Sequence, residues 1–229
     1  MSRFPQGPAV KGSQKWIQKL VNETPQPLNA EIRKQLTLST DESISWLSPR
    51  AEDDFAEYRD QTFLDLLDLN LTKVPLRDFW PAQGPQWDAL GKSESGKVLL
   101  VEAKSHILEM LSPGTGAGEK SVQKIKESLD RTKAFLNSKS DRDWLSTFYQ
   151  YTNRLAHLYL LRELNHIPAY LIFVYFVNDD EMNGPKSIDE WRGAISLMKT
   201  YLGIARHRLH KSVAEVFIDV KGLSRGSNR

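Results

Sequence analysis

The order of hydrophobic and polar residues predicts strands that alternate with helices along the chain. Residues 97–104 contain the apolar run Val-Leu-Leu-Val, and residues 169–177 form a longer apolar run. Continuous runs of this length are typical of strands with both faces covered. A further strand is predicted at residues 213–220. A short strand is predicted at residues 86–90, followed by a turn at 91–96.

Helices are predicted between these strands. Ser48-Pro49 is typical of a helix start, with Ser48 as the cap and Pro49 in the first turn, and this helix would extend to about residue 69. The other predicted helices cover residues 16–21, 28–36, 119–135, 142–164 and 187–205. This order of elements predicts an α/β fold with a mixed central β-sheet flanked by helices.

The length and composition of the chain indicate one domain with an N-terminal extension. Its 229 residues suffice to bury a substantial core. Residues 1–15 are rich in Pro, Gly and Ser, which predicts poor order, and no linker divides the remainder. We therefore expect a partly flexible extension at 1–47 and a single domain at 48–229.

Composition excludes several classes of site. The chain has no cysteine, so disulfides, thiolate zinc sites and cysteine nucleophiles are absent. Its first residues lack the apolar core of a signal peptide, and the longest apolar run is too short to span a bilayer as a helix. The expected location is a reducing cytoplasm, without a membrane partner.

The overall charge neither demands nor excludes a nucleic-acid partner. The net charge is +2, and what matters for such binding is a local basic stripe. The densest basic segment contains Arg206, His207, Arg208, His210 and Lys211. A charge run of this kind is usually a solvated face, and we interpret it so. The six tryptophans are interpreted as packing residues.

The strongest chemical signal is the end of the strand predicted at 97–104. Side chains alternate across a strand, so Glu102 and Lys104 point to the same side. Asp88 lies on the preceding predicted strand and could approach Glu102 in an antiparallel hairpin. Two converging carboxylates would bind a hard cation such as Mg²⁺ or Mn²⁺, with the Ala103 carbonyl as a third oxygen. Lys104 would then orient a water molecule and offset phosphate charge.

These residues resemble the PD-(D/E)XK nuclease superfamily, which includes restriction endonucleases, archaeal Holliday-junction resolvases and DNA-repair nucleases. Asp88, thirteen intervening residues and Glu102-Ala103-Lys104 carry the resemblance, which covers about residues 48–180. The proline of the motif is displaced, because the sequence reads Pro85-Gln86-Trp87-Asp88. The resemblance implies a restriction-endonuclease-like α-β-β-β-α-β core, and the predicted order of elements fits it.

The resemblance also implies a further acid on the helix before the sheet and phosphate-binding residues on the helix after the triplet. Glu52 and Glu57 are the candidates for the acid, with Asp53, Asp54 and Asp60 also available, and Glu57 is preferred because it would lie in mid-helix. Lys120, Gln123, Lys124 and Lys126 have suitable chemistry to contact DNA phosphates. A homodimer would suit the cutting of two strands, although no interface is assigned.

Each candidate also has an ordinary structural interpretation. Glu102 and Lys104 could be a surface pair, Asp88 a turn-flanking residue, and Glu57 a solvated residue at a helix start. Arg154 could reach a phosphate from its helix, but the favoured interpretation leaves the polar residues of that helix in water. His106 is interpreted as a loop residue, and residues 112–118 as a flexible loop beside the site.

The sequence therefore predicts Mg²⁺-dependent hydrolysis of phosphodiester bonds in DNA, with Mn²⁺ as a substitute cation. Two alternatives stay open. One is a catalytically silent nucleic-acid-binding or interaction module with the same fold. The other is a hydrolase that acts on a different phosphate ester, such as a nucleotide.

Overall fold

A mixed five-stranded sheet forms the centre of the molecule. The computed structural model describes residues 2–224. The strands follow the order β2 (Ile44–Ser48), β4 (Ala89–Ser93), β5 (Val98–Lys104), β6 (Ala169–Val177) and β7 (Val213–Asp219). β2, β4 and β5 pair antiparallel, whereas β5, β6 and β7 pair parallel. The predicted α/β class with a mixed central sheet is confirmed.

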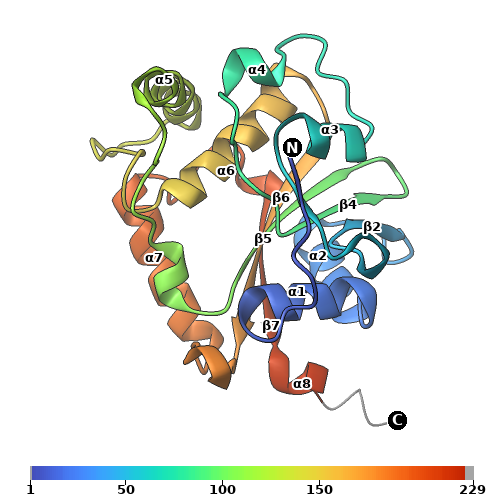
Figure 1. The fold of residues 1–229 in the computed structure, drawn as a ribbon. Coiled ribbons are helices and arrows are strands. Elements are labelled where there is room, and N and C mark those ends of the chain that lie inside the picture. Colours follow the sequence, from blue (N-terminus) through green and yellow to red (C-terminus); the bar gives the residue numbers. More distant parts are fainter. Residues whose placement is uncertain (1, 225–229) are drawn as a thin grey trace.

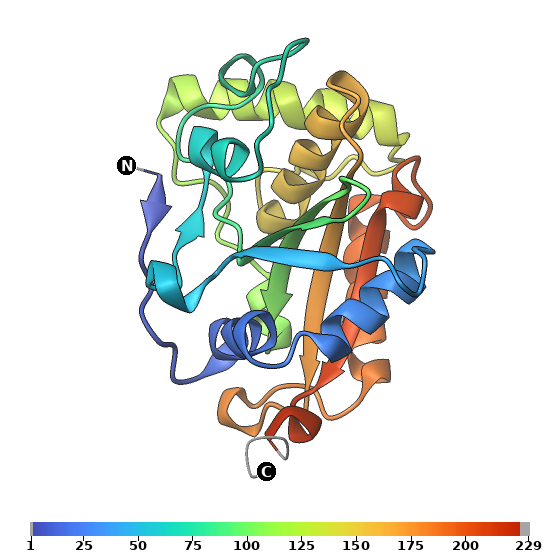
Figure 2. The same cartoon turned by 90° about the vertical axis from the view of Figure 1, so that its right-hand side faces the viewer.

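Helices cover both faces of this sheet. Helices α1 (Gly12–Asn22) and α2 (Gln26–Leu36) lie on one face, in front of the strands in Figure 2. Helices α5 (Glu119–Leu136), α6 (Tyr149–Tyr159) and α7 (Ile188–Leu202) lie on the opposite side, at the left of Figure 1. A short α8 (Val220–Ser224) follows β7. No helix among residues 2–224 is long and apolar enough to cross a membrane.

The alternation of side chains along β5 divides the core into two parts. Leu99 and Val101 pack with the apolar residues of α1 and α2, whereas Val98 and Leu100 pack with those of α5, α6 and α7. Every one of these four side chains is 0–1% exposed. Both faces of β5 are thus buried, as its continuous apolar run predicts.

The helix predicted from Ser48 to about residue 69 is wrong. Strand β2 ends at Ser48, a cis peptide bond follows at Ser48-Pro49, and the next segment is a 3₁₀ turn, η1 (Ala51–Asp53). Asp54 and Phe55 both have φ of +52°, a left-handed conformation that interrupts a right-handed helix. Helix α3 (Asp60–Leu66) begins only after this break.

A small second sheet replaces the middle of that predicted helix. Strand β3 (Glu57–Tyr58) pairs antiparallel with β1 (Arg3–Phe4), and Arg3 Nε donates to Asp53 Oδ1 at 2.9 Å. Pairing with residues more than fifty positions away outweighs the local helix signal. Glu57 therefore lies on a strand rather than in mid-helix, which corrects the prediction of its setting.

Strands β5, β6 and β7 lie within one residue of their predicted ranges, whereas the helix predicted at 142–164 begins only at Tyr149. β6 matches its predicted range, and β5 starts one residue later. β4 begins at Ala89 and extends through Ser93, so the turn before β5 is shorter than the predicted 91–96 segment. Short helical turns complete the chain: α4 (Leu76–Phe79), η2 (Ile107–Met110), η3 (Leu160–Leu164), η4 (Asp180–Met182) and η5 (His210–Ser212).

Candidate active site

The pairing of β4 with β5 brings Asp88 and Glu102 together. Ala89 lies opposite Val101, so Asp88 and Glu102 occupy the next positions, where β4 begins and β5 continues beside β6 only. Asp88 lies two residues before Leu90, and Glu102 lies two residues after Leu100. Because side chains alternate, both acids point to the side of these leucines, which face the core under α5, α6 and α7. The two acids thus lie side by side on one face of the sheet.

Asp88 is held by the backbone of the triplet. Its Oδ2 accepts a hydrogen bond from the Ala103 N–H at 2.6 Å. Burial raises the pKa of Asp88 well above its ordinary value, and the charges of Glu102 and Glu57 raise it further. Such repulsion requires that the three carboxylates lie near one another. Lys104 opposes this effect only in part.

Both carboxylate oxygens of Glu102 are paired with cations. Oε1 lies 2.5 Å from Lys104 Nζ, and Oε2 lies 2.7 Å from Nε and 2.6 Å from Nη2 of Arg154. Glu102 is only 3% exposed. Burial opposes its ionisation, but Arg154 and Lys104 outweigh burial and hold the pKa of Glu102 below its ordinary value.

Lys104 is anchored between the sheet and α6. Besides Glu102, its amine donates to Gln150 Oε1 at 3.0 Å. Burial lowers the pKa of Lys104, but Glu102 and Asp88 outweigh it, so the pKa lies above the ordinary value. Lys104 is therefore a fixed cation at neutral pH. Gln150 belongs to the run 150–154 that could reach into a site from its helix, but the favoured interpretation left its polar residues in water.

Arg154 is buried rather than solvated. Its Nη1 donates to Asn153 Oδ1 at 2.9 Å, its Nη2 donates to the Gln86 carbonyl at 2.7 Å, and its guanidinium lies 4.9 Å from the Trp87 ring centre. The favoured interpretation, with the polar residues of this helix in water, is wrong. Every residue of α6 from Tyr151 to Tyr159 is buried, because α6 packs between the sheet and α5.

Glu57 reaches the same region from β3. Its Oε2 accepts a hydrogen bond from Gln86 Nε2 at 2.5 Å, and its Oε1 accepts one from Gln14 Nε2 at 3.2 Å. Burial raises its pKa, with a contribution from Glu102. An isolated bridge between Tyr58 and Trp87 brings this strand next to the segment that carries Asp88.

A groove of about 740 Å³ opens beside these residues. Its walls are residues 82–86, the glycine-rich segment 112–118, the start of α5 and the start of α6. Three of its lining residues also contact the charged cluster: Gln86 bonds to Glu57, Gln150 to Lys104, and Arg154 to Glu102. The groove therefore borders the cluster through Gln86, Gln150 and Arg154.

The other predicted contact residues have different settings. Lys120 is exposed on the first turn of α5, between Gly118 and Ser121, which line the groove. The Lys124 amine instead donates to the Arg77 carbonyl. His106 Nδ1 accepts a hydrogen bond from the Leu108 N–H and so caps η2.

The donor set suits a hard divalent cation, although it is not assembled around one. Asp88, Glu57 and Glu102 supply carboxylate oxygens, which such cations prefer. The Ala103 N–H points toward Asp88, and the carbonyl of a strand residue faces the same side as its N–H. Among residues 2–224, however, no three acidic or histidine side chains are already grouped as metal ligands.

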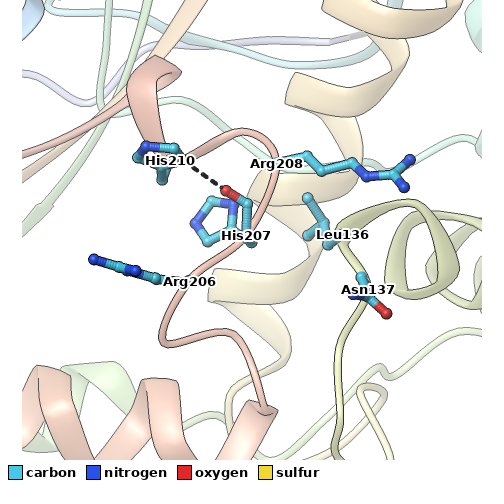
Figure 3. A pocket seen from close by; sticks show the side chains of 6 residues that line it. All are labelled: Leu136, Asn137, Arg206, His207, Arg208 and His210. Atoms are coloured by element: carbon cyan, nitrogen blue, oxygen red, sulfur yellow. Dashed lines mark hydrogen bonds between the residues drawn. The ribbon is translucent and has the colours of Figure 1, made fainter.

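The basic segment near the C-terminus forms a second cavity, of about 550 Å³. Figure 3 shows that Arg206 and Arg208 extend in opposite directions from it, while His210 bonds to the His207 carbonyl. Burial lowers the pKa of His207 to about 4, with contributions from Lys199 and His210, so this ring is neutral. These cations do not converge on one point, and both arginines are exposed.

Comparisons with models of protein families, with curated proteins and with solved structures found no match to this chain. The resemblance to the PD-(D/E)XK superfamily therefore stays a prediction, carried by Asp88, Glu102, Ala103 and Lys104.

Proposed function

We propose that the chain is a Mg²⁺-dependent nuclease that hydrolyses phosphodiester bonds in DNA. One observation carries the proposal: Asp88, immediately before β4, is held beside Glu102 by the Ala103 N–H of β5, with Lys104 on the same face as Glu102 and a groove alongside. Two acids and a lysine at the end of a buried strand are the components that metal-assisted phosphodiester hydrolysis requires.

The metal would be held by Asp88, Glu102, Glu57 and the Ala103 carbonyl. When bound, Mg²⁺ supplies Lewis acidity toward the phosphate and a lowered pKa for a water molecule. The repulsion that raises the pKa of Asp88 supports this assignment, because a site with excess carboxylate charge gains most from a cation. Mn²⁺ would substitute for Mg²⁺, since both prefer oxygen ligands.

Lys104 would act as a cation rather than as a base. Its pKa lies above the ordinary value, so its amine is protonated and can donate to the attacking water or to a phosphate oxygen. Gln150 fixes the amine from α6, at 3.0 Å. Lys104 would thereby stabilise the negative charge that develops in the transition state.

The groove would bind the nucleic acid. Its lining is rich in amides and hydroxyls, including Gln83, Thr115 and Asn153, which donate to phosphate and sugar oxygens. Lys120, at the edge of the groove, would add a sequence-independent phosphate contact. Contacts of this kind position a backbone and give no base specificity.

The pairing of Glu102 favours a second candidate function. Because Arg154 and Lys104 already satisfy both of its oxygens, Glu102 could be a purely structural member of a buried ion-pair network. The chain would then be a catalytically silent nucleic-acid-binding or interaction module. Such a module would bind Mn²⁺ no better than its Asp88→Ala variant.

A cleavage assay tests the proposal. Wild-type protein and Lys104→Ala are incubated with linear, circular, single-stranded and branched DNA, each with Mg²⁺, with Mn²⁺ and with EDTA. We expect the wild type to cut at least one substrate, only with a divalent cation, and the variant to cut none. Cleavage that persists in EDTA or in Lys104→Ala would contradict the assigned site.

A further inference from the structure

The ion pair between Arg154 and Glu102 occupies an oxygen that the proposed metal would need. Arg154 places two nitrogens on Glu102 Oε2, at 2.7 and 2.6 Å, and Lys104 holds Oε1. The Glu102 and Arg154 side chains are 3% and 7% exposed. A cation that binds Oε2 of Glu102 must therefore displace Arg154, because two guanidinium nitrogens already occupy the lone pairs of this oxygen.

We propose that Arg154 is an exchangeable partner of Glu102: a divalent cation displaces its guanidinium, which then turns into the groove and binds a substrate phosphate. The inference rests on the proposed function, and it adds an order of events to it. Arg154 would stabilise the metal-free site and would hold substrate only after the metal has bound.

The geometry identifies Arg154 rather than Lys104 as the partner that leaves. Lys104 lies two residues from Glu102 on the same strand and is also held by Gln150. Arg154 comes from α6, on a long side chain, and already lines the groove. To leave Glu102, its guanidinium must also give up the Gln86 carbonyl, but Gln86 and its other partner, Asn153, line the same groove. Lys104 instead lines a separate cavity beside Gln150, so its amine has no comparable path into the groove.

Charge favours the exchange. In the metal-free site, Arg154 and Lys104 oppose the charges of Asp88, Glu57 and Glu102. A divalent cation bound beside Arg154 and Lys104 would place three cationic groups around Glu102. The buried setting strengthens the repulsion between them. Departure of the guanidinium relieves this repulsion. A phosphate in the groove then provides the bidentate acceptor that an arginine fork prefers.

Metal affinity tests the exchange without reference to activity. Mn²⁺ is titrated calorimetrically into the wild type, Arg154→Gln and Arg162→Gln. Arg162, in the η3 turn that continues α6, donates to the Ala169 carbonyl and is the matched control. We expect Arg154→Gln to bind Mn²⁺ about tenfold more tightly, because no partner must be displaced, and Arg162→Gln to bind as the wild type does. Arg154→Lys, which keeps the charge but loses the fork, should be intermediate.

Substrate binding tests the second half of the inference. Ca²⁺ is used with a short fluorescein-labelled DNA duplex and single strand, so that binding is measured by anisotropy without a requirement for cleavage. With saturating Ca²⁺, Arg154→Gln should bind the preferred DNA about tenfold more weakly than the wild type, whereas Arg162→Gln should match it. Equal affinity for the wild type and Arg154→Gln would overturn the phosphate role.

The outcomes separate this inference from the proposed function. Mn²⁺ binding that Asp88→Asn abolishes but that Arg154→Gln leaves unchanged or weakens would overturn the exchange alone. Binding by Arg154→Gln but not by the wild type would support the exchange. Absence of Mn²⁺ binding in every protein would overturn both. If Arg154→Gln does not fold, Arg154→Lys decides: affinity equal to that of the wild type contradicts the exchange.

Discussion

Oδ2 of Asp88 accepts the backbone N–H of Ala103 at 2.6 Å, across the point where β4 begins and β5 continues. This bond fixes the carboxylate beside the Glu102-Ala103-Lys104 triplet. It also satisfies the Ala103 N–H, which has no partner on β4 because the last residue of β5 that pairs with β4 is Val101. A side chain thus continues the ladder and aligns the site.

Replacement of Asp88 by Asn should stabilise the metal-free protein at neutral pH. Burial and neighbouring acids raise the pKa of Asp88, so stability conferred by this group is present at low pH and is lost as pH rises through the folded-state pKa. Asn removes the charge and keeps an acceptor for Ala103. Urea unfolding in EDTA at pH 7.5 should show a gain of about 1 kcal/mol, the scale of one pKa unit.

The same pair of proteins should converge in acid. Near pH 4 the folded wild type carries a protonated Asp88, and the advantage of Asn should shrink. Asp65→Asn, which changes an exposed acid of α3, is the matched control. It should change the free energy of unfolding by no more than about 0.5 kcal/mol, both at pH 7.5 and near pH 4. An Asp88→Asn protein that is less stable than the wild type at pH 7.5 would contradict the electrostatic account.

Gln150 should matter for catalysis and not for metal binding. Its side-chain oxygen positions the Lys104 amine at 3.0 Å, and it contacts no acid of the site. Gln150→Leu should reduce the cleavage rate roughly 10- to 100-fold, with the Mn²⁺ affinity unchanged. Gln61→Leu, at an exposed position of α3, serves as the control. A parallel loss of metal affinity in Gln150→Leu would assign Gln150 a structural role instead.

His157 should make the fold sensitive to acid. Burial lowers its pKa to about 3, from an ordinary value of 6.5, and its ring packs against Phe63, Trp80 and Trp87. The unfolded chain therefore binds one more proton than the native state between these values, so stability falls as pH decreases from about 6.5 toward 3. The contribution to the slope is about 1.4 kcal/mol per pH unit.

His157→Phe keeps an aromatic ring and removes the titration. Its free energy of unfolding should depend on pH less steeply than that of the wild type between pH 4 and 6.5. Denaturant unfolding at several pH values gives both slopes. Identical slopes for the two proteins would show that His157 is already protonated in the native state.

The strands, and the position of the triplet at the end of β5, could be predicted because their signals are local. The apolar run 169–177 is short and rich in aromatic and β-branched residues, which favours a strand. Its predicted bounds match β6. The short distance in sequence between Asp88 and Glu102 also limits how they can pair. A tight hairpin brings them opposite each other, and the structure has that arrangement.

The errors concern long-range contacts. Glu57 lies on a strand because β1 pairs with β3 and because Asp54 and Phe55 interrupt the helix that the local pattern favours. Arg154 is buried because it pairs with Glu102. This partner lies 52 residues earlier in the chain. The spacing of apolar residues does not predict a distant ion-pair partner. A buried arginine on a helix therefore cannot be distinguished in the sequence from a solvated one.

The central claim is that Asp88 and Glu102 form a divalent-cation site. Its most direct test is calorimetric titration of Mn²⁺ into the wild type, Asp88→Asn, Glu57→Gln and the control Asp65→Asn. We expect binding by the wild type and Asp65→Asn, about tenfold weaker binding by Glu57→Gln, and none by Asp88→Asn. Equal Mn²⁺ affinity in the wild type and Asp88→Asn, or no binding in any of the four, would contradict the claim.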